Sequence, residues 1–570
     1  MRFSNRERIA RYFDLFILFV ELDIFILVLF ELSYSLRPFV YNSGRILIII
    51  YILDLIVQFL LDPRPKTHFL NFWHQYASLI AIIVLFNQFM AVPETNPFIF
   101  LYSKLFLGAV EIILFIRFFT RIDRIRELWG SFRVNPAQAI IMSFATIILL
   151  GSFLLYLPYA RPNGANMRYI DSLFTSTSAV CVTGLIVVDT GTAFSLVGKI
   201  FLLFLIQAGG LGIMTIAAFI QVSTGSEMSL YGRFSTAALL DQANIRNLYT
   251  IIKSIVLITF SFEAMGVLLF YPSISKISLR VGDALFSSLF HSVSAFCNAG
   301  FSLYSDSFME ARSNIGVNLT LIFLIVSGGI GFTVLLNLLR RAAKGRNERI
   351  TVQTRLVLLT TLFLILFGTV NIFLLEKDAL FRDYTHTERF LSSLFQSVTT
   401  RTAGFNTVDI SLVRSRTMFL MSILMFIGAS PGSTGGGIKT TTFFILVLSI
   451  ITILRDQRFN TIFKRRIPYA VVNRAIAILV SAVGFIILGT LLLSISERFG
   501  FMQLYFETVS AFGTVGLSTG ITPGLSDFGK IVIMLMMFIG RLGPLTLVLA
   551  IRNVQSTRLV TYPEERVMVG

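Results

Sequence analysis

Four stretches of the 570-residue chain follow a common plan, and this repeat constrains the fold more than any other feature. Each stretch begins with Phe, continues through small and hydroxyl-bearing residues, and ends on a Gly that precedes Leu or Phe. The closing glycines are Gly184, Gly300, Gly404 and Gly516, and the third copy is one residue shorter between its Phe and its Gly. A spacing of about a hundred residues is longer than a soluble solenoid repeat and suits membrane hairpins. We therefore expect four equivalent loops within a membrane protein.

The composition places the chain in a lipid bilayer. It is 55% hydrophobic with a mean hydropathy of +0.79, which is typical of a polytopic membrane protein and excludes a soluble multidomain protein. The formal net charge of +17 fits basic cytoplasmic linkers at 340–346 and 464–466 and does not indicate nucleic-acid binding. Cys181 and Cys297 indicate no disulfide framework, and the four histidines show no metal-ligand spacing. The charged residues form no recognisable catalytic set, so we do not expect an enzyme.

The apolar segments divide the chain into five parts. Residues 1–130 hold four such segments without the loop motif and are expected to form a separate N-terminal membrane module. A pattern of span, loop, span and basic linker then recurs in units at 131–225, 226–345, 346–466 and 467–570. Because basic linkers face the cytoplasm, each loop opens outward. The expected fold is an all-α polytopic membrane protein with four pseudo-symmetric helix–pore-loop–helix units around one pore, preceded by about four extra transmembrane helices.

The four loops are suited to a dehydrated cation, which needs a ring of oxygens in place of its water shell. Backbone carbonyls can supply that ring, and Gly lets a carbonyl point toward the pore axis without a side-chain clash. A short helix is expected before each loop, with its negative C-terminal end favouring the cation. The candidate selectivity-filter residues are Val182, Thr183, Gly184, Asn298, Ala299, Gly300, Thr402, Ala403, Gly404, Thr514, Val515 and Gly516.

Glycines also interrupt the second span of each unit, and the interruption is longest in the third unit, at 428–440. Proline and several glycines there destabilise a regular helix, so we predict an intramembrane loop beneath the filter that obstructs the pore. The candidate gate residues are Gly428, Ser430, Pro431, Gly432, Ser433, Thr434, Gly435, Gly436, Gly437 and Lys439. The run nearly matches a phosphate-binding loop, but an extra Ile precedes Lys439 and the run lies between membrane spans. We therefore expect no nucleotide at this site.

Three further charges fall at membrane depth. Arg541 stands near the middle of the last span, where an unpaired arginine costs at least about 2.5–3.5 kcal/mol. We predict that it faces the pore and belongs to the gate. Arg401 precedes the third filter segment and is expected to brace the loop, with Glu507 as its partner.

Five motifs carry a resemblance to a known family, at 395–407, 435–440, 510–518, 540–546 and 562–570. From residue 135 onward the sequence resembles the ion-conducting membrane subunits of the Trk/Ktr/HKT superfamily of potassium transporters, and most closely the bacterial Ktr type. The resemblance implies a homodimer in the cell membrane, surrounded by lipids, with K⁺ as the transported substrate at the filter carbonyls. In related plant proteins a Ser in place of the first filter Gly goes with sodium transport, so four glycines imply potassium. The family works with a separate cytosolic ring of nucleotide-binding regulatory subunits, and this chain is expected to bind no nucleotide itself.

The N-terminal module departs from Ktr-type subunits, which lack extra helices. Its fourth apolar segment runs into Arg117, Arg121 and Arg124, at spacings loosely similar to those of a voltage sensor. A helical scaffold with snorkelling basic ends is the simpler interpretation. The favoured hypothesis is potassium uptake gated at 428–440 under control of a cytosolic regulatory subunit. The alternative is a voltage-responsive cation channel gated by the N-terminal module without a regulatory ring.

Overall fold

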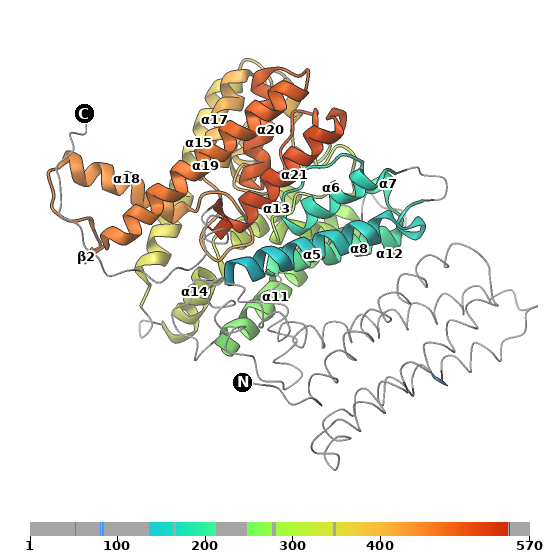
Figure 1. Ribbon diagram of the computed structural model, residues 1–570, viewed down its shortest axis with the longest axis horizontal. Helices are drawn as coiled ribbons and strands as arrows, with labels where there is room; N and C mark the ends of the chain where they lie inside the picture. The colour runs from blue at the N-terminus through green and yellow to red at the C-terminus, as the bar shows by residue number, and fades with distance from the viewer. Residues whose placement is uncertain are drawn as a thin grey trace, which may run out of the picture.

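A computed structural model describes residues 136–162, 167–212, 248–275, 281–345 and 349–544, together with isolated helical positions at 52, 80, 83, 84, 546 and 547. The described part of the chain is almost wholly helical (Figure 1). The predicted N-terminal module at 1–130 and the C-terminal motif at 562–570 lie outside the described residues, apart from those isolated positions.

A long helix, a short helix and a second apolar helix recur along the described chain, and we call each recurrence a unit. Unit 1 comprises α5 (Pro136–Tyr156), η1 (Pro158–Ala160), α6 (Tyr169–Val180), α7 (Thr190–Ala193) and α8 (Leu196–Leu211). Unit 2 comprises α11 (Leu248–Ile274), α12 (Val281–Phe296), α13 (Ile315–Gly329) and α14 (Phe332–Lys344). Unit 3 comprises α15 (Val352–Glu376), α16 (His386–Thr399), η4 (Ile410–Leu412), α17 (Ser415–Phe426) and α18 (Thr440–Leu454). Unit 4 comprises α19 (Tyr469–Ser496), α20 (Phe501–Gly513), η5 (Thr522–Gly524) and α21 (Asp527–Leu542).

A small antiparallel hairpin, β1 (Thr461–Ile462) and β2 (Arg465–Arg466), joins units 3 and 4. Within the described residues, α15, α19 and most of α11 are each long and apolar enough to cross a bilayer. Helices α13 and α14 together meet the same test but are bent by 104° at their junction. The protein is therefore a membrane protein with several broken or short apolar helices beside its long ones.

Glycine breaks the second helix of each unit at the positions that the sequence predicts. Helices α8, α13 and α21 are followed by Gly212, Gly331 and Gly543, all at positive φ, where other residues are strained. At Gly331 a Cβ atom would also lie 2.5 Å from the carbonyl oxygen of Pro431. In unit 3 the break widens into the segment between α17 and α18, which we call the inner loop (residues 427–439).

The short helices α6, α12, α16 and α20 are fixed by the residues that define the sequence motif. The opening phenylalanines, Phe174, Phe290, Phe395 and Phe506, are fully buried and pack each short helix against its neighbours. A serine in three of these helices donates a hydrogen bond to a carbonyl of the neighbouring long helix. These bonds join Ser176 to Ile148 at 2.7 Å, Ser292 to Glu263 at 2.6 Å, and Ser397 to Ile365 at 2.8 Å. The motif therefore specifies how each short helix docks.

The units pack in a closed cycle. Helix α8 packs against α12, α13 against α16, α17 against α20, and α21 returns to α6 (Figure 1). The last contact joins segments far apart in sequence and contains a buried ion pair, with Lys530 Nζ 2.7 Å from Asp171 Oδ1. The exposed side chain of Arg168 also pairs with Asp171, at 3.4 Å, and with Asp527, at 3.0 Å.

We expect Lys530→Met to weaken this closing contact by about 3 kcal/mol, because it leaves the buried Asp171 carboxylate without its buried partner. The measurement is the thermal unfolding midpoint of the purified protein in detergent. The matched control is Arg168→Gln, which removes an exposed partner of the same carboxylate and should cost less than about 1 kcal/mol. Equal midpoints for the two variants would show that the buried pair does not hold units 1 and 4 together.

Candidate functional site

The four motif glycines lie next to one another and form a closed ring. A Cβ atom placed on Gly184 would lie 2.5 Å from the carbonyl oxygen of Ala299. A Cβ atom on each of the other glycines would likewise meet a carbonyl oxygen of the next loop. The distances are 2.7 Å from Gly300 to the Ala403 oxygen and 2.5 Å from Gly404 to the Val515 oxygen, and Gly516 meets the Thr183 oxygen, which closes the ring. A side chain at any of these glycines would therefore collide with the neighbouring loop, which explains why Gly is required at the crossing.

The three residues that end each motif, which we call a glycine loop, share an unusual backbone. The first residue of each loop has a positive φ although it is not glycine: Val182 at 56°, Asn298 at 59°, Thr402 at 70° and Thr514 at 49°. The glycine two positions later also has a positive φ, between 71° and 88°, and the residue between them does not. Alternation of this kind places successive N–H groups on one side of the chain and successive carbonyls on the other.

The N–H groups of the glycine loops point back to the short helices. Thr183, Ala299 and Val515 each donate to the carbonyl five residues earlier, at 2.8, 2.7 and 2.8 Å. Side-chain hydroxyls add support, since Ser178 Oγ accepts from Gly184 N at 3.0 Å and Thr399 Oγ1 donates to Phe405 O at 2.7 Å. The sequence motif therefore supplies hydroxyl residues where the loop leaves the helix.

The carbonyls of the glycine loops are free. Among the hydrogen bonds of the described residues, none ends on a backbone oxygen of residues 182–184, 298–300, 402–404 or 514–516. These residues are buried, except that Gly300 is half-buried. A buried carbonyl without a donor is costly, so a row of them is retained only where something else supplies positive charge.

The shorter third motif reaches the same arrangement by a tighter turn. Ala403 N donates to Thr399 O, four residues earlier, at 3.0 Å, whereas the other three units use a spacing of five. This tighter turn at the end of α16 thus compensates for the missing residue. Gly404 remains in register with its neighbours in the ring.

The inner loop lies against the first residues of two glycine loops and against the end of α12. Gly436 N donates to Thr514 Oγ1 at 2.9 Å, and Gly435 lies against Thr402 Oγ1. Thr434 Oγ1 donates to Phe296 O at 3.3 Å, at the end of α12. Residues 434–436 therefore touch units 2, 3 and 4 at once, and all three are buried.

Three basic side chains bond to carbonyls of the inner loop; Arg541 and Arg401 do so from outside it, and Lys439 does so from within it. Arg541 donates to Thr434 O and to Gly209 O, which ties the loop to α8 and α21. Lys439 Nζ donates to Gly435 O at 2.7 Å, and Arg401 Nη2 donates to Gly428 O at 3.2 Å. The loop is therefore clamped from units 3 and 4.

The remaining predicted gate residues pack the inner loop against unit 2 and against itself. Ser430 N donates to Gly329 O at 3.0 Å, and Phe332 N donates to Gly432 O at 2.9 Å. Ser433 Oγ donates to Ser430 O at 2.6 Å, Pro431 O lies at Gly331, and Gly437 has a positive φ of 69° beside Gly428. All ten predicted loop residues thus lie in one connected segment.

The predicted pairing of Arg401 with Glu507 is wrong. The Glu507 carboxylate accepts hydrogen bonds from Ser518 Oγ, from Thr519 N at 3.2 Å and from Thr522 Oγ1 at 3.2 Å. These three donors lie just after the fourth glycine loop, so the Glu507 carboxylate fixes the chain as it leaves that loop. With its oxygens engaged there, Glu507 is not a partner of Arg401. Arg401 instead contacts the inner loop.

Sequence reasoning missed His291, which occupies the same motif position as Glu507. Its Nε2 accepts from Leu303 N at 3.2 Å, so Nδ1 carries the proton and donates to Ser287 O at 2.8 Å. His291 braces the chain after the second glycine loop, and its position directly after the motif Phe was the available signal. Among the described residues no three His, Cys, Asp or Glu side chains gather as a metal site, and Cys181 and Cys297 are free and buried.

Comparisons with known proteins agree with this architecture. The family described as "TrkH: Cation transport protein" matches residues 133–562. The chain is 39% identical to "Ktr system potassium uptake protein B" of Bacillus subtilis, over 77% of this chain and 97% of that protein. It is 40% identical to the protein of the same name from Vibrio alginolyticus, over 76% and 94%, and 34% identical to "Potassium/sodium uptake protein NtpJ" of Enterococcus hirae, over 77% and 98%.

A solved structure shares the fold. The potassium transporter TrkH from Vibrio parahaemolyticus superposes with a TM-score of 0.59 at 17% identity, covering 91% of this chain and 99% of that one. At this identity the likeness speaks for the fold alone.

We expect Gly184→Ala to destabilise the ring, because its φ of 88° strains a side chain and its Cβ would meet the Ala299 carbonyl. A cost of about 1–3 kcal/mol should appear as a lower thermal unfolding midpoint. The matched control is Gly484→Ala in the interior of α19, where nothing lies within 4 Å of the new Cβ and the change should leave the midpoint unchanged or raise it slightly. A ring variant as stable as the control would contradict the close approach of the loops.

Proposed function

Because the chain belongs to the TrkH family of cation transport proteins and includes a Ktr-type membrane subunit, we propose that it takes up potassium across the cell membrane through the ring of glycine loops. In this proposal residues 131–225, 226–345, 346–466 and 467–570 are four pore units, and 1–130 is an additional membrane module. The names of the relatives, which include potassium uptake and potassium/sodium uptake, support K⁺ as the substrate class.

The observation that carries the proposal is the closed ring of free, buried carbonyls. Three oxygens from each loop are available, and their N–H groups are already engaged by the short helices. A dehydrated K⁺ needs such oxygens, and the C-terminal ends of α6, α12, α16 and α20 add negative potential at the same place. Four glycines allow all four loops to approach the axis equally, which supports potassium selectivity.

The inner loop is the proposed gate. It lies against Thr402 and Thr514 at the base of two glycine loops, so an ion leaving the ring has to pass it. Conduction then requires the loop to move, and the bonds from Arg541 and Arg401 to its carbonyls favour the closed position. Its sequence of glycines and hydroxyl residues suits a segment with two arrangements.

Control of the gate is proposed to come from outside the chain. Two relatives are named as components of a Ktr system, which supports a membrane subunit that works with other components. We propose a homodimer regulated by a cytosolic ring of nucleotide-binding subunits. The competing possibility, voltage gating by the N-terminal module, is tested by the same experiment as selectivity.

We expect the purified protein in liposomes, under opposed K⁺ and Na⁺ gradients, to reverse near the K⁺ equilibrium potential with little dependence on voltage. Gly404→Ser should move the reversal potential toward the midpoint, because a Ser Cβ would lie 2.5 Å from the Val515 carbonyl and distort the ring. The loss of selectivity should be about tenfold. Gly484→Ala is the control and should behave as the parent protein.

Two results would overturn parts of this proposal. An unchanged K⁺/Na⁺ preference in Gly404→Ser would show that the glycine loops do not form the selectivity filter. Steep voltage dependence in the protein alone would replace the regulatory ring by the N-terminal module.

We expect deletion of residues 433–436 to raise K⁺ flux in the absence of any partner by about tenfold, because it removes the atoms that touch Thr402 and Thr514. Arg541→Gln should also raise flux, but by less, since Arg401 still bonds to Gly428 O of the loop. The measurement is rubidium uptake into liposomes at matched protein density. Arg340→Gln, an exposed arginine of α14, is the charge-matched control. A folded deletion protein that conducts no faster than its parent would show that the inner loop is not the gate.

A further inference from the structure

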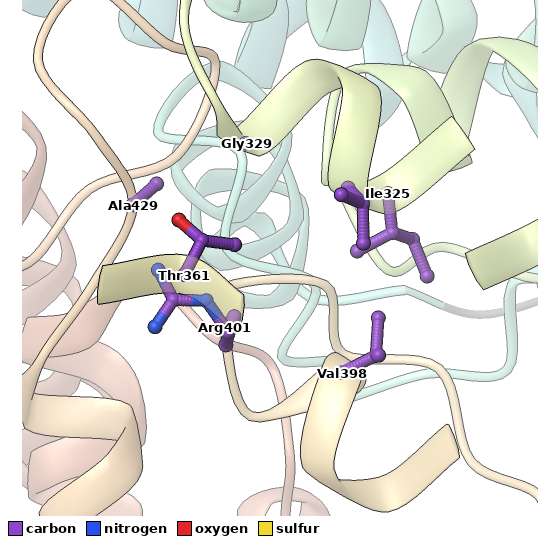
Figure 2. Close-up of a pocket in the computed structure, with 7 residues that line it drawn as sticks. Ile325, Gly329, Thr361, Val398, Arg401 and Ala429 are labelled. Atoms are coloured by element: carbon purple, nitrogen blue, oxygen red, sulfur yellow. The ribbon is translucent and has the colours of Figure 1, made fainter. Parts of the chain in front are cut away.

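A small cavity lies between units 2 and 3, beside the inner loop. It is bounded by Ile325 and Gly329 of α13, Thr361 of α15, Val398 at the end of α16, Arg401 and Ala429 (Figure 2). It is small and partly enclosed. A cavity of this size accepts one small molecule or ion.

Two polar groups in the cavity wall have no partner. Arg401 and Thr361 are each only 7% exposed, and neither Arg401 Nη1 nor Thr361 Oγ1 forms a hydrogen bond with any described residue. Figure 2 shows the Thr361 hydroxyl and the Arg401 guanidinium at the end of the cavity near Ala429, with Ile325 and Val398 at the other end. Both groups can donate a hydrogen bond into the same space.

The charge of Arg401 is also uncompensated. A guanidinium stays protonated in proteins, and a buried charge is costly unless an opposite charge accompanies it. Its one bonded acceptor is the neutral Gly428 carbonyl, and the ion pairs of the described residues include no carboxylate near it. Glu507, the acid that the sequence suggests as its partner, is saturated elsewhere.

We propose that this cavity binds a small monovalent inorganic anion, with chloride as the physiological example. Arg401 Nη1 supplies a charged donor and Thr361 Oγ1 a neutral one, while the apolar remainder suits a weakly hydrated halide. One guanidinium balances one negative charge, so a divalent oxyanion such as sulfate would leave a buried charge uncompensated. A bound halide neutralises the guanidinium, which water cannot do.

The anion has a consequence for conduction, and this second step rests on the proposed pore. Arg401 directly precedes Thr402, so its charge raises the potential at the third glycine loop and lowers cation occupancy there. A halide beside Arg401 cancels part of that potential. The anion binds Nη1 and leaves the hydrogen bond from Arg401 Nη2 to Gly428 O in place, so Arg401 still holds the inner loop.

The binding test uses bromide as the probe. Crystals of the full-length protein grown in bromide, with diffraction collected at the bromine absorption edge, should show an anomalous peak between Arg401 Nη1 and Thr361 Oγ1. The peak should disappear in Arg401→Gln and weaken in Thr361→Val. The matched control is Thr360→Val, which removes the neighbouring buried and unpartnered hydroxyl of α15 outside the cavity and should keep the peak. Density without anomalous signal in the parent protein means water only and overturns the proposal.

The conduction test compares rubidium uptake into liposomes in chloride and in gluconate at fixed cation concentration. Uptake by the parent protein and by Thr360→Val should be about three- to tenfold higher in chloride. Thr361→Val should take up rubidium in both media at the lower rate that the parent protein shows in gluconate. If bromide binds but uptake is equal in the two media, the site exists and the proposed effect on conduction is wrong. Neither outcome of this test bears on K⁺ selectivity. Failure of the proposed pore would instead appear in the reversal potential.

Discussion

The free carbonyls of the glycine loops are the constraint on which the rest of the structure depends. They must face one another inside the protein, and that direction requires a left-handed residue at both ends of each loop. For Val182, Asn298, Thr402 and Thr514 this conformation costs about 1–2 kcal/mol each. The cost is offset locally, because each loop's N–H groups bond to a short helix whose Phe is fully buried. The docking of α6, α12, α16 and α20 therefore decides the geometry of the carbonyls.

The same requirement explains why the long helices carry glycine opposite the short ones. Side chains at Gly151, Gly266 and Gly368 would collide with Ser176, Ser292 and Ser397, the residues that bond to the long-helix backbone. Close approach here lets the serine hydroxyl reach a carbonyl across the helix interface. A larger residue would push the short helix away and shift its loop with it. Helix packing and the positions of the loop carbonyls are thus mechanically coupled.

The sequence predicts the parts that repeat and misses the parts that do not. The four glycines, the short helices and the broken second helices follow from a motif that recurs in register, and each has a local physical cause. The positive φ at the first loop residue could not be predicted in three of the loops, because Val182, Thr402 and Thr514 are β-branched and rarely adopt it; only Asn298 is of a type that does so more readily. The partner of Lys530 depends on which helices meet in the closed cycle. The partners of Glu507 lie in the irregular chain after its own glycine loop, where sequence spacing does not predict side-chain contacts, and the pairing expected for Glu507 is wrong. The N-terminal module lies outside the described residues, so its expected voltage-sensor likeness stays a prediction.

The position three residues before each ring glycine shows how a symmetric ring acquires one specialised unit. Units 1 and 2 carry Cys181 and Cys297 there, and the Cys297 sulfur lies where a side chain on Gly210 would be. Unit 4 carries Gly513, since a Cβ would lie 2.8 Å from the carbonyl of Met425, just before the inner loop. Unit 3 alone carries a charge, Arg401, and it is also the unit from which the inner loop arises. The residue that holds the loop and the residue that makes room for it therefore occupy equivalent places in neighbouring units. A ring of four similar units can hold a single inner loop only if equivalent positions diverge in this way, because the loop contacts its neighbours in units 2, 3 and 4 through different residues.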